Sequence, residues 1–98
     1  MDADELDGFD WDAGNSEKNW QKHGVSVGEC EETSFNQPLL VAFDAAHSLG
    51  EARHFALGRT NQGRLLFIAF AYRGTKIRVI SARDMSRKER MIYAKANS

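Results

Sequence analysis

The stretch RLLFIAFAYRGTKIRVISA, residues 64–82, decides the fold of this 98-residue chain. It holds two β-rich runs, Arg64–Tyr72 and Thr75–Ala82, separated by the dipeptide Arg73-Gly74. A dipeptide ending in glycine between two such runs is typical of a tight hairpin turn. Strands joined by a turn this short pair antiparallel, and this turn would place Tyr72 opposite Thr75.

The segments around this hairpin predict an α+β domain. Further strands are expected at Leu39–Phe43 and Arg53–Arg59, a short edge strand at Phe9–Asp12, and helices at Asn15–His23, from Ser26 to about Phe35 and from Ser86 to about Ala96. Gly24 suits a left-handed helix end, and Ser26/Glu29 and Ser86/Glu89 have capping-box spacing. The order β-α-α-β-β-β-β-α predicts one antiparallel sheet with helices on one face.

Composition narrows the class of protein. The single cysteine, Cys30, excludes an internal disulfide and is expected to be a buried apolar thiol. No Cys/His spacing resembles a zinc site, so we expect no metal and no cofactor. The first residues are acidic, and the longest apolar run, 65–72, is too short to cross a membrane. We expect a cytoplasmic protein with an acidic, disordered extension at 1–8 and one domain over 9–98.

The net charge of −1 hides a division of the chain. Residues 1–44 carry eleven acidic and two basic residues, whereas residues 45–98 carry three acidic and eleven basic residues. Segregation of acidic and basic residues along a chain gives information about its binding partners and little about its fold. Either the acidic half neutralises the basic half within one compact body, or an exposed basic face binds a polyanion.

The predicted hairpins gather cations at one end of the sheet. If Arg59 pairs with Arg64, and Tyr72 with Thr75, then Arg59, Arg64 and Arg83 share one end of one face with Ser81. A slip of one residue in the second turn would replace Arg83 and Ser81 by Ala82 and Ile80. Like charges opposite each other destabilise a sheet by a few tenths to about 1 kcal/mol per pair.

A second unfavourable placement occurs where the last helix begins. Arg87 and Lys88 fall in its first turn, where the helix dipole disfavours cations by roughly 0.3–1 kcal/mol each. Positions that break a local rule without structural gain are typical of functional sites. The alternative is that these long side chains simply reach water, where screening removes the cost.

A phosphodiester backbone suits such a cation cluster, because arginine binds phosphate through two hydrogen bonds. Cleavage of RNA without a metal needs a base for the 2′-hydroxyl, an acid for the leaving oxygen, and cations near the charge that develops at phosphorus. Histidine is the residue type best suited to acid–base catalysis near neutral pH, and the chain has three, His23, His47 and His54. None of the three stands out as essential. Arginines, lysines and a tyrosine are alternatives for the same roles.

Six segments, in order, resemble the BrnT family, the toxin half of a bacterial type II toxin–antitoxin pair. They are FDWD (9–12), KNWQKHGV (18–25), HSLGEAR (47–53), GRLLFIAF (63–70), IRVISAR (77–83) and RKERMIY (87–93). The stretch AGNS at 13–16 departs from the family pattern and predicts a late start for the first helix. The resemblance implies a RelE-like fold, a metal-independent endoribonuclease that inhibits translation, and a BrnA-type antitoxin. It also implies a 2:2 complex that represses its own operon and contacts operator DNA only through the antitoxin.

Residue roles follow from the same resemblance and from the cation pattern. The candidate catalytic residues are Arg53, Arg83, Tyr93 and His23. The candidate RNA-binding residues are Lys22, Arg59, Arg64, Arg78, Ser81, Arg87 and Lys88. Glu89 is interpreted as a structural helix cap.

Two other functions remain open. In the first, the basic face belongs to a non-catalytic subunit that holds an acidic antitoxin segment, since charge alone does not separate this function from RNA cleavage. A DNA-binding domain is the third possibility, but no groove-reading helix of known type is present.

Overall fold

The computed structural model describes residues 8–96. Its elements are α1 (Ala13–His23), α2 (Val27–Thr33), β1 (Leu40–Phe43), the 3₁₀ helix η2 (Ala45–His47), β2 (His54–Arg59), β3 (Leu65–Arg73), β4 (Lys76–Asp84) and α3 (Arg87–Ala96). The predicted disordered extension, 1–8, lies outside the described residues except for Gly8, whose carbonyl accepts a 3.0 Å hydrogen bond from the Ile77 N–H. No helix within 8–96 has the length and apolar character that crossing a bilayer requires.

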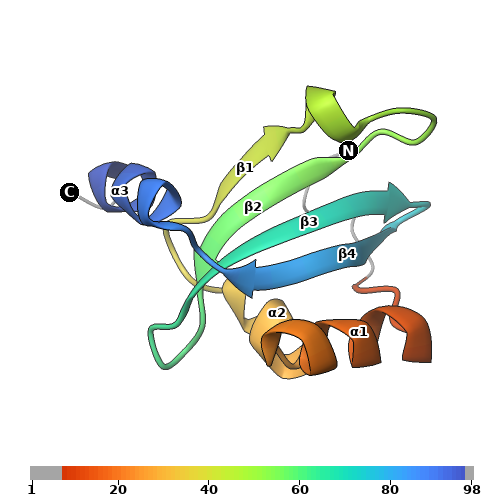
Figure 1. Ribbon diagram of the computed structural model, residues 1–98, viewed down its shortest axis with the longest axis horizontal. Helices are drawn as coiled ribbons and strands as arrows, with labels where there is room; N and C mark the ends of the chain where they lie inside the picture. The colour runs from red at the N-terminus through yellow and green to blue at the C-terminus, as the bar shows by residue number, and fades with distance from the viewer. Residues whose placement is uncertain (1–7, 97–98) are drawn as a thin grey trace.

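The strands form one antiparallel sheet in the order β1-β2-β3-β4, which confirms the predicted α+β class (Figure 1). The predicted edge strand at Phe9–Asp12 is reduced to a single bridge. Phe9 pairs with Ile77 in parallel, and the Asp10 N–H donates to the Ile77 carbonyl at 2.8 Å. The N-terminal segment therefore runs beside β4 and turns directly into α1.

Helix α1 begins earlier than expected. Asp12 is its N-cap and forms a capping box with Asn15: the Asp12 side chain accepts from the Asn15 N–H, and the Asn15 side chain accepts from the Asp12 N–H. These bonds offset the weak helix propensity of Gly14, Asn15 and Ser16. At the other end, Gly24 adopts φ 64°, the left-handed cap that the sequence predicts.

The buried side of α1 is polar. Trp20, the largest apolar residue of this helix, is 60% exposed, whereas Asn15 and Asn19 are 6% and 2% exposed. Asn15 Nδ2 donates to the Val79 carbonyl, and Asn19 Oδ1 accepts from the Ala82 N–H, both at 3.0 Å. The two amides thus satisfy backbone groups of the edge strand β4, which an apolar helix face would leave unpaired.

The predicted strand register is wrong by one residue at the first hairpin. Arg59 pairs with Leu65, not with Arg64, so the side chains of β3 exchange faces relative to those of β2. The second hairpin also differs from the prediction: Tyr72 pairs with Ile77, not with Thr75, and a bulge near Ile80 then shifts the pairing again. Because of these shifts, Arg59 and Arg83 share one face while Arg64 lies on the other. The predicted cluster of three arginines does not form.

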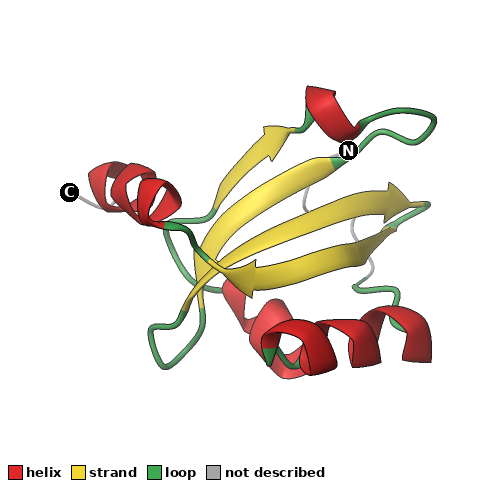
Figure 2. Ribbon diagram, viewed as in Figure 1, coloured by secondary structure: helices red, strands yellow, loops and turns green. Residues whose placement is uncertain are grey.

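The sheet carries an apolar cluster on each face. Toward α1 and α2 the buried residues are Val25, Cys30, Ala56, Leu66, Ile68, Phe70, Val79 and Ala82. On the opposite face Leu57, Met85 and Tyr93 form a smaller cluster, against which Leu40, Leu65 and Phe67 pack. Helix α3 therefore covers one end of the second face, as Figure 2 shows, and the expectation that all helices share one face is wrong.

Candidate functional site

The sheet face opposite α1 and α2, called the open face below, is covered by α3 only at one end. Its residues follow from strand alternation and from the observed pairing. They are Arg53, Phe55, Leu57 and Arg59 on or beside β2, Leu65, Phe67, Ala69, Ala71 and Arg73 on β3, and Lys76, Arg78, Ser81 and Arg83 on β4. Arg53 belongs here because the Asp44 N–H donates to its carbonyl at 2.9 Å, which continues the β1–β2 pairing.

Arg83 has the most defined surroundings on this face. Its guanidinium carbon lies 4.1 Å from the centroid of the Phe67 ring, a cation–π contact. Nη1 and Nη2 donate to the two carboxylate oxygens of Glu89 at 2.8 and 3.0 Å, and Nη1 also donates to the Asp84 carbonyl at 3.1 Å. The hydrogen bonds from Arg83 hold the pKa of Glu89 below its ordinary value. The side chain of Arg83 is still 35% exposed.

An aromatic surface supports this arginine. The rings of Phe55 and Phe67 stack with their centroids 5.4 Å apart and an interplanar angle of 20°. Leu57 and Ser81 lie in the same two rows, since Leu57 pairs with Phe67 while Ser81 and Phe55 both pair with Ala69. Stacked rings beside a cation suit the bases and phosphates of single-stranded nucleic acid.

Arg53 and Arg78 lie farther along the face. Arg78 pairs with Ala71, and its Nη2 donates to Asp12 at 2.9 Å while Nη1 lies 3.5 Å from Asp10. The Arg53 side chain makes no hydrogen bond or ion pair with the described part of the chain. From strand spacing and rise, Arg53 lies roughly 16 Å from Arg83. A single phosphate cannot hold both, so the two would contact different phosphates of one strand.

Two other predicted residues are engaged elsewhere. Arg64 donates to Asp84, Glu29, the Gly24 carbonyl and the His23 carbonyl, at 2.8–3.2 Å. These bonds use all five of its N–H groups and join β3 and β4 to the turn between α1 and α2. Arg59, at the α3 end of the open face, donates through Nε to the Gln37 carbonyl at 2.9 Å.

Tyr93 is buried beneath α3. It is 3% exposed, its hydroxyl donates to the Pro38 carbonyl at 2.7 Å, and burial raises its pKa. The structure therefore gives the hydroxyl a structural contact, and the catalytic role predicted for Tyr93 stays a prediction.

The remaining predicted cations lie at the margins. Arg87 and Lys88 are exposed in the first turn of α3, without ion pairs to any described residue. His23 is the last residue of α1 and lies at the same end of the sheet as Arg83, but on the side of the sheet that α1 covers. Hydrogen bonds from Arg64 are the main cause of the lowered pKa of Asp84, and His23 is a smaller one. Lys22 is exposed on α1. Neither Lys22 nor His23 faces the open face.

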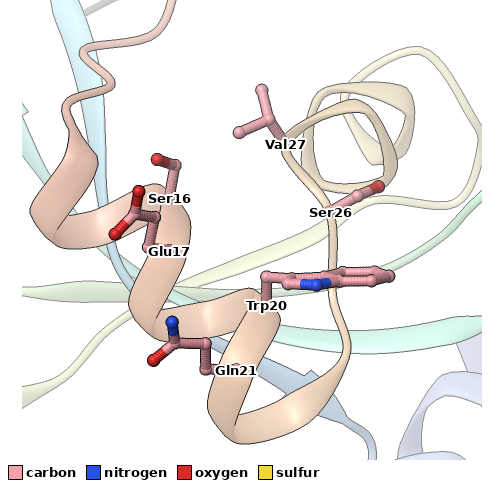
Figure 3. A pocket seen from close by; sticks show the side chains of 6 residues that line it. All are labelled: Ser16, Glu17, Trp20, Gln21, Ser26 and Val27. Carbon is pink, nitrogen blue, oxygen red and sulfur yellow. The ribbon is translucent and has the colours of Figure 1, made fainter.

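An open hollow lies away from these residues. An open depression of about 420 Å³ separates α1 from the start of α2 and is lined by Ser16, Glu17, Trp20, Gln21, Ser26 and Val27 (Figure 3). Glu17 is its one charged lining residue, so it does not suit a polyanion. Across residues 8–96, no group of three His, Cys, Asp or Glu side chains is placed to share a metal ion.

Sequence reasoning found the arginines but missed what positions Arg83. The stacked pair Phe55/Phe67 could have been found from alternation once the correct register was known, because both rings fall on the face of Arg83. The capping spacing led to an interpretation of Glu89 as a cap alone. Glu89 does cap α3, with its Oε1 accepting from the Ser86 N–H at 2.8 Å, but it binds Arg83 as well.

Comparison with known proteins gives a family match and a fold match. A family model described as the ribonuclease toxin BrnT of a type II toxin–antitoxin system matches residues 11–89. The crystal structure of the Brucella abortus ribonuclease toxin BrnT superposes with a TM-score of 0.61 at 24% identity, covering 82% of this chain and 97% of that one. At this identity the superposition shows the fold alone. A search of curated proteins gives no match. The family match spans most of the chain, which therefore belongs to the BrnT family of ribonuclease toxins of type II toxin–antitoxin systems.

Proposed function

We propose that this protein is an endoribonuclease that cleaves RNA on the open face without a metal and thereby inhibits translation. The observation that carries the proposal is Arg83, fixed over Phe67 with part of its guanidinium free toward solvent. Family membership supports a ribonuclease toxin with an antitoxin partner. The cellular RNA that it would cut places its action in the cytoplasm.

The chemistry asks for positioning, charge stabilisation and two proton transfers. When the 2′-oxygen attacks phosphorus, its proton passes to water, the bond to the 5′-oxygen breaks, and the 5′-oxygen takes a proton from water, while negative charge grows on the non-bridging oxygens. A preorganised guanidinium at that point stabilises the transition state, and losing one such donor costs about 10²–10³ in rate. In this proposal Arg83 serves the scissile phosphate, while Arg53, Arg78, Ser81 and Arg59 hold flanking nucleotides.

The predicted roles outside the open face are given less weight. Arg64 has no N–H left for phosphate, and Lys22 and His23 face away. Arg87 and Lys88 are free and exposed beside Arg83, so they suit a longer RNA strand leaving the face.

The decisive test uses purified protein and single-stranded RNA in EDTA. Wild type is expected to cleave, and Arg83→Ala is expected to lose about 10²–10³ in rate. Lys18→Ala is the matched control, because it also removes one cation, but from an exposed position on α1, on the opposite side of the sheet from the open face. Equal rates for Arg83→Ala and wild type, with both proteins folded, would remove the proposal.

The partner is proposed to be a BrnA-type antitoxin in a 2:2 complex that represses its own operon through the antitoxin's DNA-binding part. The acids that bind arginines within this chain, Glu89 on Arg83 and Asp12 on Arg78, support the proposal that an acidic antitoxin segment covers the same face. Co-expression should abolish toxicity, and operator DNA should bind only the complex.

The same contacts support a second candidate, a non-catalytic subunit that uses the open face to hold its antitoxin. Expression without the antitoxin separates the two. Growth arrest with loss of RNA, abolished by Arg83→Ala, supports the enzyme. Folded wild-type protein without any effect on growth or RNA supports the binding subunit.

A further inference from the structure

Arg83 is held on three sides and open on a fourth. The guanidinium carbon of Arg83 lies 4.1 Å from the centroid of the Phe67 ring on β3. The ring of Phe55, on the neighbouring strand β2, stacks on Phe67. The Nη1–Nη2 end of Arg83 is taken by the Glu89 carboxylate, and the outer N–H of Nη1 by the Asp84 carbonyl. Of the five guanidinium N–H groups, only the Nε–H and one Nη2–H are left without a partner in the described chain.

These two N–H groups form one edge of the guanidinium and point in parallel. The chain itself shows what this edge binds. Arg64 holds Asp84 through Nε and Nη2 at 2.8 and 3.2 Å, and Arg73 holds Glu51 through the same atoms at 2.6 and 3.0 Å. In both pairs the Nε–Nη2 edge grips two oxygens of one anion, which is also the geometry of a bidentate phosphate contact.

We propose that Glu89 is a positioning residue that holds Arg83 so that its Nε–Nη2 edge receives two non-bridging oxygens of an RNA phosphate. The inference rests on the proposed function for the identity of the ligand, and it goes beyond the helix-capping role of Glu89. A free arginine side chain loses considerable rotamer freedom when it binds, whereas Arg83 has already lost it.

Glu89→Gln should not weaken RNA binding, but it should slow RNA cleavage. Glu89→Gln removes one negative charge next to the site, which by itself favours RNA binding. It also replaces one of the two acceptors of Arg83 by an NH₂ group, which cannot accept the Nη2 hydrogen bond. We expect equal or slightly tighter RNA binding and a single-turnover cleavage rate lower by about 10²-fold, within the range for a misplaced donor.

Ser86→Ala is the matched control. Ser86 Oγ accepts from the Glu89 N–H at 3.2 Å, so this variant weakens the cap of α3, but the backbone N–H of Ser86 still holds Glu89, and Arg83 is untouched. If Glu89 acted only as a cap, both variants would behave alike. We expect Ser86→Ala to cleave within about threefold of wild type, because its substitution moves no group that contacts RNA.

A double-mutant cycle shows whether Glu89 acts through Arg83. In an Arg83→Ala background, Glu89→Gln should cause no further loss of rate, because the residue that it positions is absent. A further loss of the full size would assign Glu89 a role of its own and overturn the proposal. So would a Glu89→Gln rate within about threefold of Ser86→Ala.

A second readout does not depend on cleavage. The Arg83 Nε–H resonance, assigned by its absence in Arg83→Lys, should shift when a non-cleavable 2′-O-methyl oligoribonucleotide is added to wild type or Ser86→Ala. It should be broadened and unresponsive in Glu89→Gln. If wild type does not cleave RNA but this resonance shifts, the ribonuclease proposal fails, and the proposal that the Nε–Nη2 edge of Arg83 binds an RNA phosphate is supported. If wild type cleaves and the resonance does not move, the proposal about this edge is overturned and the ribonuclease stands.

Discussion

Asn19 accepts a hydrogen bond of 3.0 Å from the backbone N–H of Ala82, with both residues almost fully buried. The same amide donates to the Asn15 carbonyl at 2.9 Å. Asn19→Ala leaves the Ala82 N–H without a partner, so we expect the free energy of unfolding to fall by about 1–3 kcal/mol. Urea unfolding at neutral pH checks this. Lys18→Ala, an exposed neighbour on α1, should stay within about 0.5 kcal/mol of wild type, and an equal loss in the two variants would contradict the prediction.

The position of Asn19 also shows where sequence reasoning stops. Alternation and capping patterns predict nearly every helix and strand, because they depend on neighbours along the chain. Trp20 is the largest apolar side chain of α1, yet it is exposed and two amides are buried. The reason is tertiary: the β4 edge needs hydrogen-bond partners, and only its contact with α1 reveals that need.

Strand register is the other property that the sequence left open. The Thr60 N–H donates to the Arg64 carbonyl at 2.9 Å, which closes the first hairpin one residue later than the predicted Arg59/Arg64 pair. This single residue decides which face each arginine occupies. The candidate site was thus predictable as a set of residue types, Arg83 and Ser81 included, but its three-dimensional grouping was not.

Gly58 and Gly28 should respond to alanine with opposite signs. A Cβ on Gly58 would lie 3.1 Å from both Leu39 Cδ1 and Thr33 Cβ, so Gly58→Ala should destabilise the protein by about 1–3 kcal/mol. A Cβ on Gly28, inside α2, would meet nothing closer than Ser26 Oγ at 4.0 Å. Gly28→Ala should stabilise by about 0.5–1 kcal/mol. Thermal unfolding of the two variants measures both effects, and a shared sign would show that the packing of α2 on β2 is looser than described.

The stability that Arg64 contributes should decrease at acidic pH, because its carboxylate partners become protonated. Hydrogen bonds from Arg64 lower the pKa of Asp84. Burial opposes a similar shift at Glu29, but the Ser26 N–H and Arg64 outweigh it. Because these folded-state pKa values lie below the unfolded ones, the stabilisation is present above about pH 4.5 and is lost as pH falls through the lowered values. Arg64→Met should therefore lose about 1–3 kcal/mol at pH 7 and show a flatter decline of stability below pH 4.5.

RNA affinity provides the control for Arg64. Its N–H groups are all bonded within the chain, so RNA binding by Arg64→Met, measured where the variant is folded, should stay within about threefold of wild type apart from the loss of one charge. A tenfold or greater loss would instead support the direct RNA contact that the sequence predicted.

Cys30 should make the protein less stable at alkaline pH. Burial raises the pKa of its thiol from 9.0 to about 12. Below pH 9.0 the thiol is protonated in both states, whereas above it the unfolded chain loses the proton and the folded chain keeps it. Stability should then fall with rising pH by up to about 1.4 kcal/mol per unit. Cys30→Ala, compared with wild type by urea unfolding at pH 8 and pH 10, should show the shallower fall; parallel curves would contradict the raised pKa.

Tyr93→Phe separates two roles for the buried hydroxyl. In the structure this hydroxyl donates to the Pro38 carbonyl at 2.7 Å and holds α3 against the chain before β1. Removing it should lower the free energy of unfolding by about 0.5–1.5 kcal/mol, while RNA cleavage by the folded variant stays within about threefold of wild type. A hydroxyl that served the reaction would give the reverse pattern, a loss of about 10²–10³ in rate at unchanged stability. Measuring urea unfolding and single-turnover cleavage on the same preparation decides between them, and the reverse pattern would mean that α3 moves to expose Tyr93 when RNA binds.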